Sequence, residues 1–161
     1  RPVSSAASDV YKRQVLASPN DIDSFRKTGQ RRDLNREKFE ANQLLDVLKN
    51  FDSPASKNIS YLTHIVKVRS RLKAFHPEAS MKCISTNIAN CIILQRGLDE
   101  DSVYVICNMS SKFLSISPLN QINSLELTPE KRLLDNITGS YFNTDTFKLN
   151  PYQVVWLTLA D

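Results

Sequence analysis

Residues 88–108 read I-A-N-C-I-I-L-Q-R-G-L-D-E-D-S-V-Y-V-I-C-N, two apolar runs separated by a short polar segment that begins with Gly97. Both runs are rich in β-branched and aromatic residues, which favour strands, and the segment 97–101 is typical of a hairpin loop longer than two residues. Further runs of the same kind predict strands at 82–85, 113–117, 124–127, 146–149 and 152–159. No helix of crossover length separates these strands, so the sequence predicts a mostly antiparallel sheet in a small sandwich.

Upstream of residue 80 the apolar residues recur at helical spacing instead. A second helix is predicted at about 55–74, with Ser53 as its N-cap, Pro54 at its first position and Pro77 beyond its end. The two apolar stripes consist of Phe39, Leu44, Leu45, Val47 and Leu48, and of Ile59, Leu62, Ile65, Val66 and Leu72. The chain is therefore predicted to be α+β, with a domain boundary between residues 79 and 80.

The length of 161 residues suffices for one ordinary domain or two small ones, and the composition limits the classes of function. No apolar run approaches the ~20 residues of a membrane span, and no signal peptide is visible. Three cysteines without C-x-x-C spacing indicate reduced core residues, which places the protein in the cytoplasm. The basic excess is confined to residues 26–38, with Phe25 as its only aromatic, so the pattern does not predict a nucleic-acid binder.

The first 14 residues carry neither a helical nor a strand period. They begin with Arg1 rather than methionine and resemble an adapter-derived sequence, so we interpret residues 1–14 as a non-native or disordered leader. On this interpretation the chain is a fragment, divided into residues 15–79 and residues 80–161.

The densest group of polar side chains lies in the segment T-G-Q-R-R-D-L-N-R-E-K at 28–38. Within seven residues it supplies three guanidinium groups, two carboxylates and one amide, which together suit a hydroxyl-rich or anionic ligand. Other catalytic patterns are absent from the sequence, which has no H-E-x-x-H, no G-x-S-x-G and no glycine-rich phosphate loop. His64 and His76 have no cluster of further ligands nearby, so we expect neither a metal nor a cofactor.

Four strings, taken in order, carry a resemblance to a known family. They are L-A-S-P-N-D-I-D-S-F-R-K-T-G-Q-R-R-D-L-N-R-E-K at 16–38, V-R-S-R-L-K-A-F-H-P at 68–77, V-I-C-N-M-S at 105–110 and L-N-P-Y-Q-V-V-W-L at 149–157. Together they resemble the carboxyl-terminal part of sucrose phosphorylase and its glucosylglycerate-phosphorylase relatives in the α-amylase superfamily.

The resemblance implies a catalytic (β/α)8 barrel followed by a small antiparallel β C-terminal domain. A barrel needs ~250 residues, so residues 15–79 have room only for its last βα portion. The family takes its catalytic carboxylates from strands upstream of this region, which leaves no catalytic residue in this chain. The intact parent is thus expected to be a glycosyltransferase that moves glucose from sucrose or a related α-glucoside to phosphate, and the fragment alone is expected to be inactive.

One substrate contact can be transferred from the family, whose R-D-[IL]-N-R motif lies over the mouth of the active site. Its last arginine, here Arg36, reaches the glucosyl unit, and a solvated arginine at the start of the first helix is an equal alternative. Asp21 is a weaker candidate contact, for which a turn residue is the preferred alternative. Arg32 and Asp33 are expected to brace the loop by pairing with each other or with Glu37.

The sequence leaves alternatives open for both the substrate and the class of function. The sequence reads N-R-E-K where sucrose-specific members tend to have N-R-H-Y, so the acceptor stays open, as does the oligomeric state. An amylase-like α-glucoside hydrolase is the alternative enzyme, and a stand-alone module that binds an anion or a partner is the alternative from another class.

Overall fold

A computed structural model describes residues 13–35, 38–122 and 127–160 of the chain. The chain divides into two compact units, Arg1–His64 and Ile65–Asp161, and the division falls within one long helix. The boundary predicted between residues 79 and 80 is a different one, because it separates the end of the barrel from the C-terminal domain. That boundary stays a prediction. Among the described residues no helix has the length and apolar character of a membrane span.

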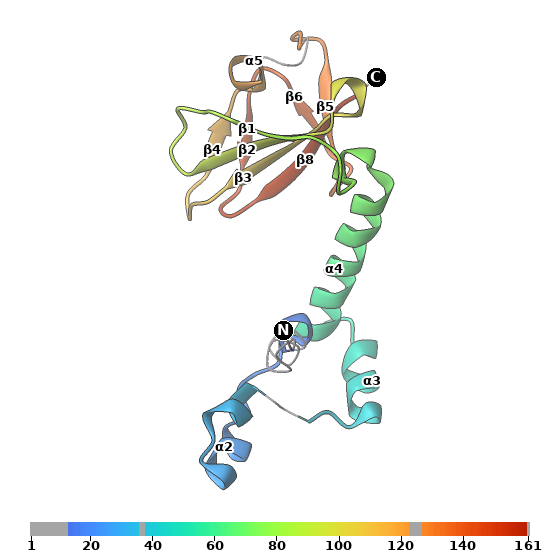
Figure 1. Ribbon diagram of the computed structural model, residues 1–161, viewed down its shortest axis with the longest axis vertical. Coiled ribbons are helices and arrows are strands. Elements are labelled where there is room, and N and C mark those ends of the chain that lie inside the picture. Colours follow the sequence, from blue (N-terminus) through green and yellow to red (C-terminus); the bar gives the residue numbers. More distant parts are fainter. Residues whose placement is uncertain (1–12, 36–37, 123–126, 161) are drawn as a thin grey trace. The chain divides into compact units, whose positions relative to one another are not determined.

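The first unit is helical (Figure 1). It contains α2 (Ile22–Thr28), the 3-10 helix η1 (Arg31–Asn35), α3 (Ala41–Lys49) and the start of α4 (Pro54–Arg71). Both predicted amphipathic helices are confirmed as α3 and α4, whereas α2 was not predicted. Neither α2 nor α3, each of which is described throughout its length, contains a buried residue.

The start of α4 follows the predicted capping pattern. The Ser53 hydroxyl accepts a hydrogen bond from the Ser56 N–H at 3.1 Å and donates one to the Val47 carbonyl at 2.7 Å. Pro54 occupies the first helical position, where its missing N–H costs no intrahelical bond. Ser53 therefore caps α4 and also binds a carbonyl in the last turn of α3.

The second unit is an antiparallel sandwich (Figure 1). Its six-stranded sheet has the order β1-β2-β3-β8-β5-β6, and β4 pairs with β7 in a second sheet. Every described strand pair is antiparallel, which confirms the predicted pairing. The strands are β1 (Met81–Ile84), β2 (Cys91–Arg96), β3 (Val103–Asn108), β4 (Leu114–Ile116), β5 (Arg132–Asp135), β6 (Tyr141–Asn143), β7 (Phe147–Leu149) and β8 (Val154–Ala160).

The core of this unit lies between the two sheets. Ile93, Ile106 and Val155 come from the centre of the large sheet, and Ile116 and Leu149 come from β4 and β7; all five are fully buried. At ~2 kcal/mol for each buried aliphatic side chain, this cluster supplies the main stabilisation of the unit. The predicted sandwich is thus confirmed by a core to which both sheets contribute.

Some predictions differ from the structure. The strands β5 and β6 and the short helix α5 (Pro118–Gln121) were not predicted, and the strand predicted at 124–127 lies largely outside the described residues. The hairpin loop at 97–101 is confirmed between β2 and β3, where it contains the 3-10 helix η3 (Asp99–Asp101). Cys83 is exposed rather than buried in the core, because its side chain lies on the face of β1 opposite that core.

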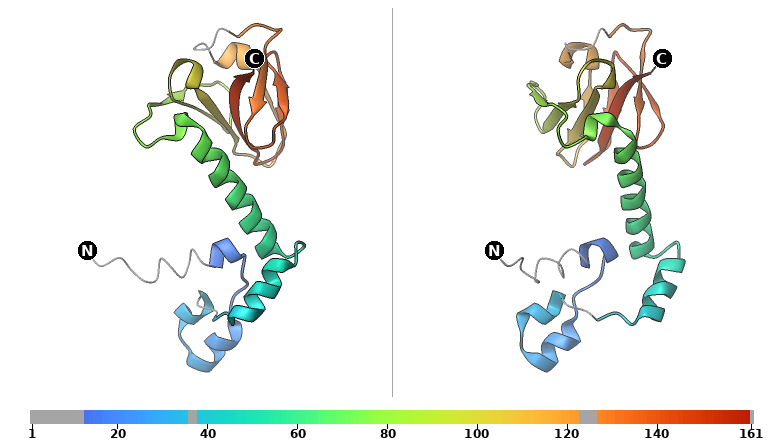
Figure 2. Two further views of the ribbon diagram at one scale, coloured as in Figure 1. Left: turned by 90° about the vertical axis from the view of Figure 1, so that its right-hand side faces the viewer. Right: turned by 45° about the vertical axis from the view of Figure 1, so that its right-hand side comes forward.

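The last strand occupies the middle of the large sheet. In Figure 2 β8, drawn in red, runs between the olive β3 and the orange β5. The buried carboxylate of Asp135 fixes this arrangement, since it accepts hydrogen bonds from the Trp156 N–H at 2.9 Å, the Ile137 N–H at 3.2 Å and the Thr138 hydroxyl at 2.7 Å. Asp135 therefore joins the turn after β5 to the neighbouring β8.

Candidate functional site

The segment from α2 to η1 forms a small closed loop in the first unit. Asp21 is the N-cap of α2, and its backbone N–H donates a hydrogen bond to the Leu34 carbonyl at 3.0 Å. Gly29 ends the helix with φ at +69°, a left-handed conformation that glycine adopts without strain. The chain thus closes a loop at Leu34, two residues before position 36, where it meets Asp21 at the start of α2.

Asp33 is held from inside this loop. The Thr28 hydroxyl donates to Asp33 Oδ2, and the Gln30 N–H donates to the Thr28 oxygen at 3.2 Å. Arg32 Nε lies 3.8 Å from Asp33 Oδ1, too far for a hydrogen bond, and 65% of the Arg32 side chain is exposed. The contact that fixes Asp33 therefore comes from Thr28, a residue that the sequence did not single out, and the bracing role of Arg32 stays a prediction.

The side chain of Asp21 caps α2. Its Oδ1 accepts the Ser24 N–H at 2.9 Å. Hydrogen bonds from the Ser24 hydroxyl and from that N–H hold the pKa of the Asp21 carboxyl below its ordinary value. A capping carboxylate is fully ionised at neutral pH, and a direct contact of Asp21 with substrate stays a prediction.

The principal candidate contact, Arg36, lies outside the described residues, as does Glu37. The described neighbours Arg31 and Arg32 are exposed, so the ordered loop before position 36 already presents two guanidinium groups to solvent. Guanidinium forks bind adjacent hydroxyls or an anion through paired donors. No group of three or more metal-ligating side chains occurs in the described ranges.

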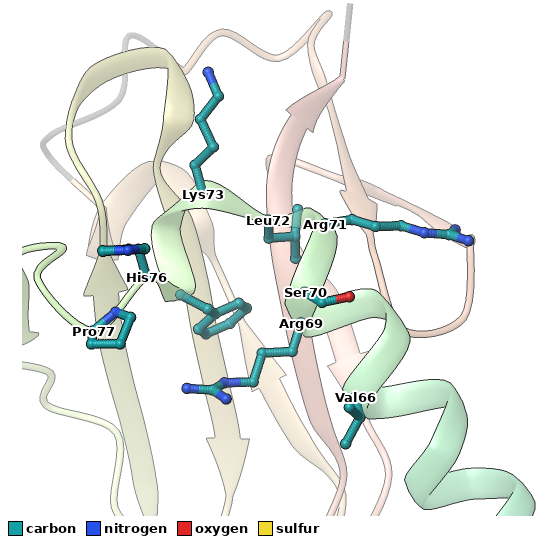
Figure 3. Close-up of a pocket in the computed structure, with 9 residues that line it drawn as sticks. Val66, Arg69, Ser70, Arg71, Leu72, Lys73, His76 and Pro77 are labelled. Atoms are coloured by element: carbon teal, nitrogen blue, oxygen red, sulfur yellow. The ribbon is translucent and has the colours of Figure 1, made fainter.

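The second family string fastens α4 to the sheet. Arg96, on β2, donates from Nε to the Ala74 carbonyl at 3.2 Å and from Nη2 to the His76 carbonyl at 2.9 Å. These acceptors belong to the 3-10 helix η2 (Lys73–Phe75) and the residue after it. Figure 3 shows Lys73 and His76 on this turn, in front of the strands. Arg96 was missed at the sequence level because its partners are backbone carbonyls about twenty residues away.

The last two family strings meet in space. The Asn108 side chain donates from Nδ2 to the Asn150 carbonyl at 2.8 Å and to the Lys112 carbonyl at 2.7 Å. The Asn108 N–H donates to the Gln153 carbonyl at 2.9 Å, and the Asn150 N–H donates to Gln153 Oε1 at 2.8 Å. Buried Asn108 therefore joins the turns after β3 and β7, which explains these strings by architecture rather than by ligand binding.

Comparison with known proteins agrees with this arrangement. The chain is 30% identical over 149 residues to the glucosylglycerate phosphorylase of Allomeiothermus silvanus, a match that covers 92% of this chain and 23% of that enzyme. The chain thus spans about a quarter of the length of that relative. No protein-family model matches the sequence.

Solved structures share the fold at low identity. An Anoxybacillus α-amylase matches 69% of this chain and 24% of its own, at 17% identity and a TM-score of 0.52. The trehalulose synthase of Pseudomonas mesoacidophila MX-45 matches 80% of this chain and 26% of its own, at 14% identity and a TM-score of 0.53. These enzymes have (β/α)8 barrels, and the predicted fold class, the end of such a barrel followed by an antiparallel sheet, agrees with the match.

The sequence match covers nearly the whole chain, and the structural matches extend beyond the sheet into the helices. Over that length the chain resembles the carboxyl-terminal part of a glucosylglycerate-phosphorylase-like enzyme of the α-amylase superfamily.

Proposed function

We propose that this chain is the carboxyl-terminal part of a retaining α-glucoside phosphorylase. The supporting observation is the match to a glucosylglycerate phosphorylase over 92% of the chain. The protein family transfers glycosyl groups, and the proposal assigns phosphate as the acceptor. Three free cysteines suit a reducing compartment, so we place the protein in the cytoplasm.

The proposed reaction proceeds in two displacements at the anomeric carbon. A carboxylate of the parent enzyme attacks that carbon, and a general acid gives its proton to the departing oxygen of the aglycone. A phosphate oxygen then displaces the carboxylate from the glucosyl ester and the phosphate gives a proton back to the general acid, so α-glucose 1-phosphate leaves and both catalytic groups are regenerated. Two inversions retain the α configuration, and we assign both catalytic carboxylates to sequence outside this chain.

Within this chain the proposal gives the binding role to Arg36. Its guanidinium would donate to two hydroxyls of the glucosyl unit, and the closed loop from Asp21 to Leu34 would hold the start of the R-D-L-N-R string in place. Asp33, which accepts a hydrogen bond from Thr28, would tie that string to the end of α2. In this scheme Arg32 supports the loop, and Asp21 is a second, weaker candidate for a sugar contact.

The test uses the longer protein that contains this sequence. We expect phosphate-dependent release of α-glucose 1-phosphate from an α-glucoside, with sucrose and glucosylglycerate as the first substrates to compare. Release of free glucose at the same rate without phosphate would contradict the proposal and identify a hydrolase of the amylase kind.

A matched pair of variants tests Arg36. Arg36→Lys keeps the charge but loses the paired donors, so we expect kcat/KM to fall by ~30- to 100-fold, the loss of about 2–3 kcal/mol. Arg31→Lys, in the same basic run, is the control and should change kcat/KM less than about threefold. Equal effects of the two substitutions would rule out a specific role for Arg36.

A further inference from the structure

A small pocket opens at the end of the large sheet where β5, β6 and β8 meet. Its volume is about 410 Å³, and it is lined by Glu130, Lys131, Arg132, Tyr141 and Ala160. These strands are neighbours in the order β8-β5-β6, with β6 at the edge (Figure 1). Two cationic side chains and one aromatic ring around a space of this size suit a small anionic ligand that also contains a ring.

The pairing register places the guanidinium and the aromatic ring on one face of the sheet. Arg132 lies opposite Ala160 of β8 and Asn143 of β6. Tyr141 lies opposite Leu134, two residues further along β5. Residues two apart on a strand share a face, so Arg132 and Tyr141 are diagonal neighbours across the strand pair. The small side chain of Ala160 fills little of the pocket beside Arg132, and one ligand can therefore reach both side chains.

One wall of the pocket is a turn that is held from inside the fold. The Lys131 N–H donates a hydrogen bond to the Thr128 carbonyl at 3.1 Å, which closes the turn. The hydroxyl of the fully buried Thr144 donates to the same carbonyl at 2.8 Å and to the Lys131 carbonyl at 3.4 Å. This buried anchor fixes the backbone of the turn before a ligand arrives, which lowers the entropic cost of binding.

The positive charge of Arg132 has no internal partner. Its side chain is exposed and forms no ion pair or hydrogen bond with another described residue. The carboxylate of Glu130 is engaged within the turn, because hydrogen bonds from the Thr128 hydroxyl and from its own N–H hold the pKa of Glu130 below its ordinary value. A guanidinium fork left open in this way suits the oxygens of a phosphate group, and Lys131 adds a second cation to the same lining.

Tyr141 supplies the second part of the pocket. It is 60% exposed on the edge strand β6, so its ring contributes little to the core. The face of an aromatic ring carries partial negative charge and attracts the polarised C–H groups of a sugar ring. A hexose phosphate offers both complementary parts, an anionic group for Arg132 and a C–H face for Tyr141.

We propose that this pocket binds a sugar phosphate, with the phosphate group on Arg132 and Lys131 and the sugar ring on Tyr141. The inference goes beyond the proposed function and does not depend on it, because it uses only the residues of the pocket and the anchor of its turn. Inorganic phosphate shares the anionic group but lacks the ring, so it should bind the same residues more weakly. Binding requires no turnover, so the absence of phosphorolysis in the longer protein would reject the proposed function and leave this inference standing.

Binding can be followed residue by residue in the 161-residue chain. In an amide NMR titration with α-glucose 1-phosphate we expect shifts at Arg132, Tyr141 and Ala160, and an affinity at least about fivefold higher than that of inorganic phosphate. Glucose alone should bind at least about tenfold more weakly than its phosphate. Shifts confined to residues 28–35 would assign the ligand to the basic loop of the first unit and overturn the inference. Equal affinities for α-glucose 1-phosphate and inorganic phosphate would also overturn it.

Matched substitutions separate the two parts of the pocket. Arg132→Gln should weaken α-glucose 1-phosphate and inorganic phosphate alike, by at least about tenfold, whereas Arg132→Lys should retain part of the affinity. Tyr141→Ala should weaken only α-glucose 1-phosphate, by about fivefold, and Tyr141→Phe should leave its affinity within about twofold. Lys112→Gln is the control, because it removes an exposed cation near the start of β4. Equal losses for Lys112→Gln and Arg132→Gln would indicate attraction to net charge alone and overturn the inference.

Discussion

Gly97, the first residue of the hairpin loop after β2, lies against Ala74 of the 3-10 helix η2. Its φ is +78°, and a Cβ there would lie 3.0 Å from the Asp101 carbonyl oxygen and 3.1 Å from the Ala74 Cβ. The hairpin therefore depends on glycine both for backbone conformation and for space. The preceding residue, Arg96, donates hydrogen bonds to the carbonyls of Ala74 and His76 and so holds the same turn.

Gly97→Ala should accordingly destabilise the sheet unit more than the same change elsewhere. We expect a loss of ~1 kcal/mol from the positive φ and about 1–2 kcal/mol more from overpacking. Gly139→Ala is the matched control, because Gly139 has φ at +74° but no atom of the described residues lies within 4 Å of the position that its Cβ would take. Urea unfolding of both variants measures the difference, and equal losses would show that Ala74 moves aside at no cost.

Asp21 gives a prediction in pH. Hydrogen bonds from Ser24 lower the pKa of Asp21 in the folded protein, so its capping contribution is complete above the unfolded pKa and is lost as pH falls through the folded one. A carboxyl-carbon NMR titration should place the Asp21 midpoint below that of a free aspartate. Ser24→Ala should raise that midpoint. An unchanged midpoint would show that the Ser24 hydroxyl does not cause the lowered pKa of Asp21.

Whether the role of a residue could be predicted from the sequence depended on how far along the chain its hydrogen-bond partner lies. Asp21 and Asp33 were singled out by the family string that contains them, whereas their contacts, Ser24 and Thr28, were not predicted although they lie within five positions. Asn108 was quoted only as part of a family string, since its partner Asn150 is 42 residues away and contributes a backbone carbonyl. No local pattern encodes such an acceptor, so the residues that assemble the sheet could not be identified in advance.

At the scale of elements, α3 and α4 were predictable from apolar residues at helical spacing, and the long strands from runs of β-branched and aromatic residues. The α4 cap at Ser53 and the apolar runs of β2, β3 and β8 were therefore located within a few residues. β5 and β6 are three to four residues long and depend on pairing with β8 and with each other. Strands stabilised by such distant pairing have no signal of their own in sequence.

The cap of α4 can be tested as an element. Ser53→Ala removes both the bond from Ser56 and the bond to Val47, so we expect a loss of ~1–2 kcal/mol in the stability of the helix. Ser60→Ala, at an exposed position inside α4, should be neutral or slightly stabilising because alanine favours helix. Circular dichroism at 222 nm during urea unfolding separates the two variants.

For the whole molecule, the two units should differ in local stability. Neither α2 nor α3, both fully within the described ranges, buries a residue, whereas β3 and β8 lie at the centre of the six-stranded sheet. In native-state hydrogen exchange of the 161-residue chain, we expect the amides of α2 and α3 to exchange within minutes and those of β3 and β8 to be protected for hours. Uniform protection across both units would favour the stand-alone module instead.

The position of β8 has a consequence for synthesis of the protein. β8 pairs with both β3 and β5, so a strand that is made after β1 to β7 joins the two halves of the sheet. Before it emerges from the ribosome, β1, β2 and β3 can form a meander, but β5 and β6 have no strand that connects them to it. Loss of β8 should therefore leave two separate ribbons with unpaired edges, which makes termination near residue 150 a route to aggregation.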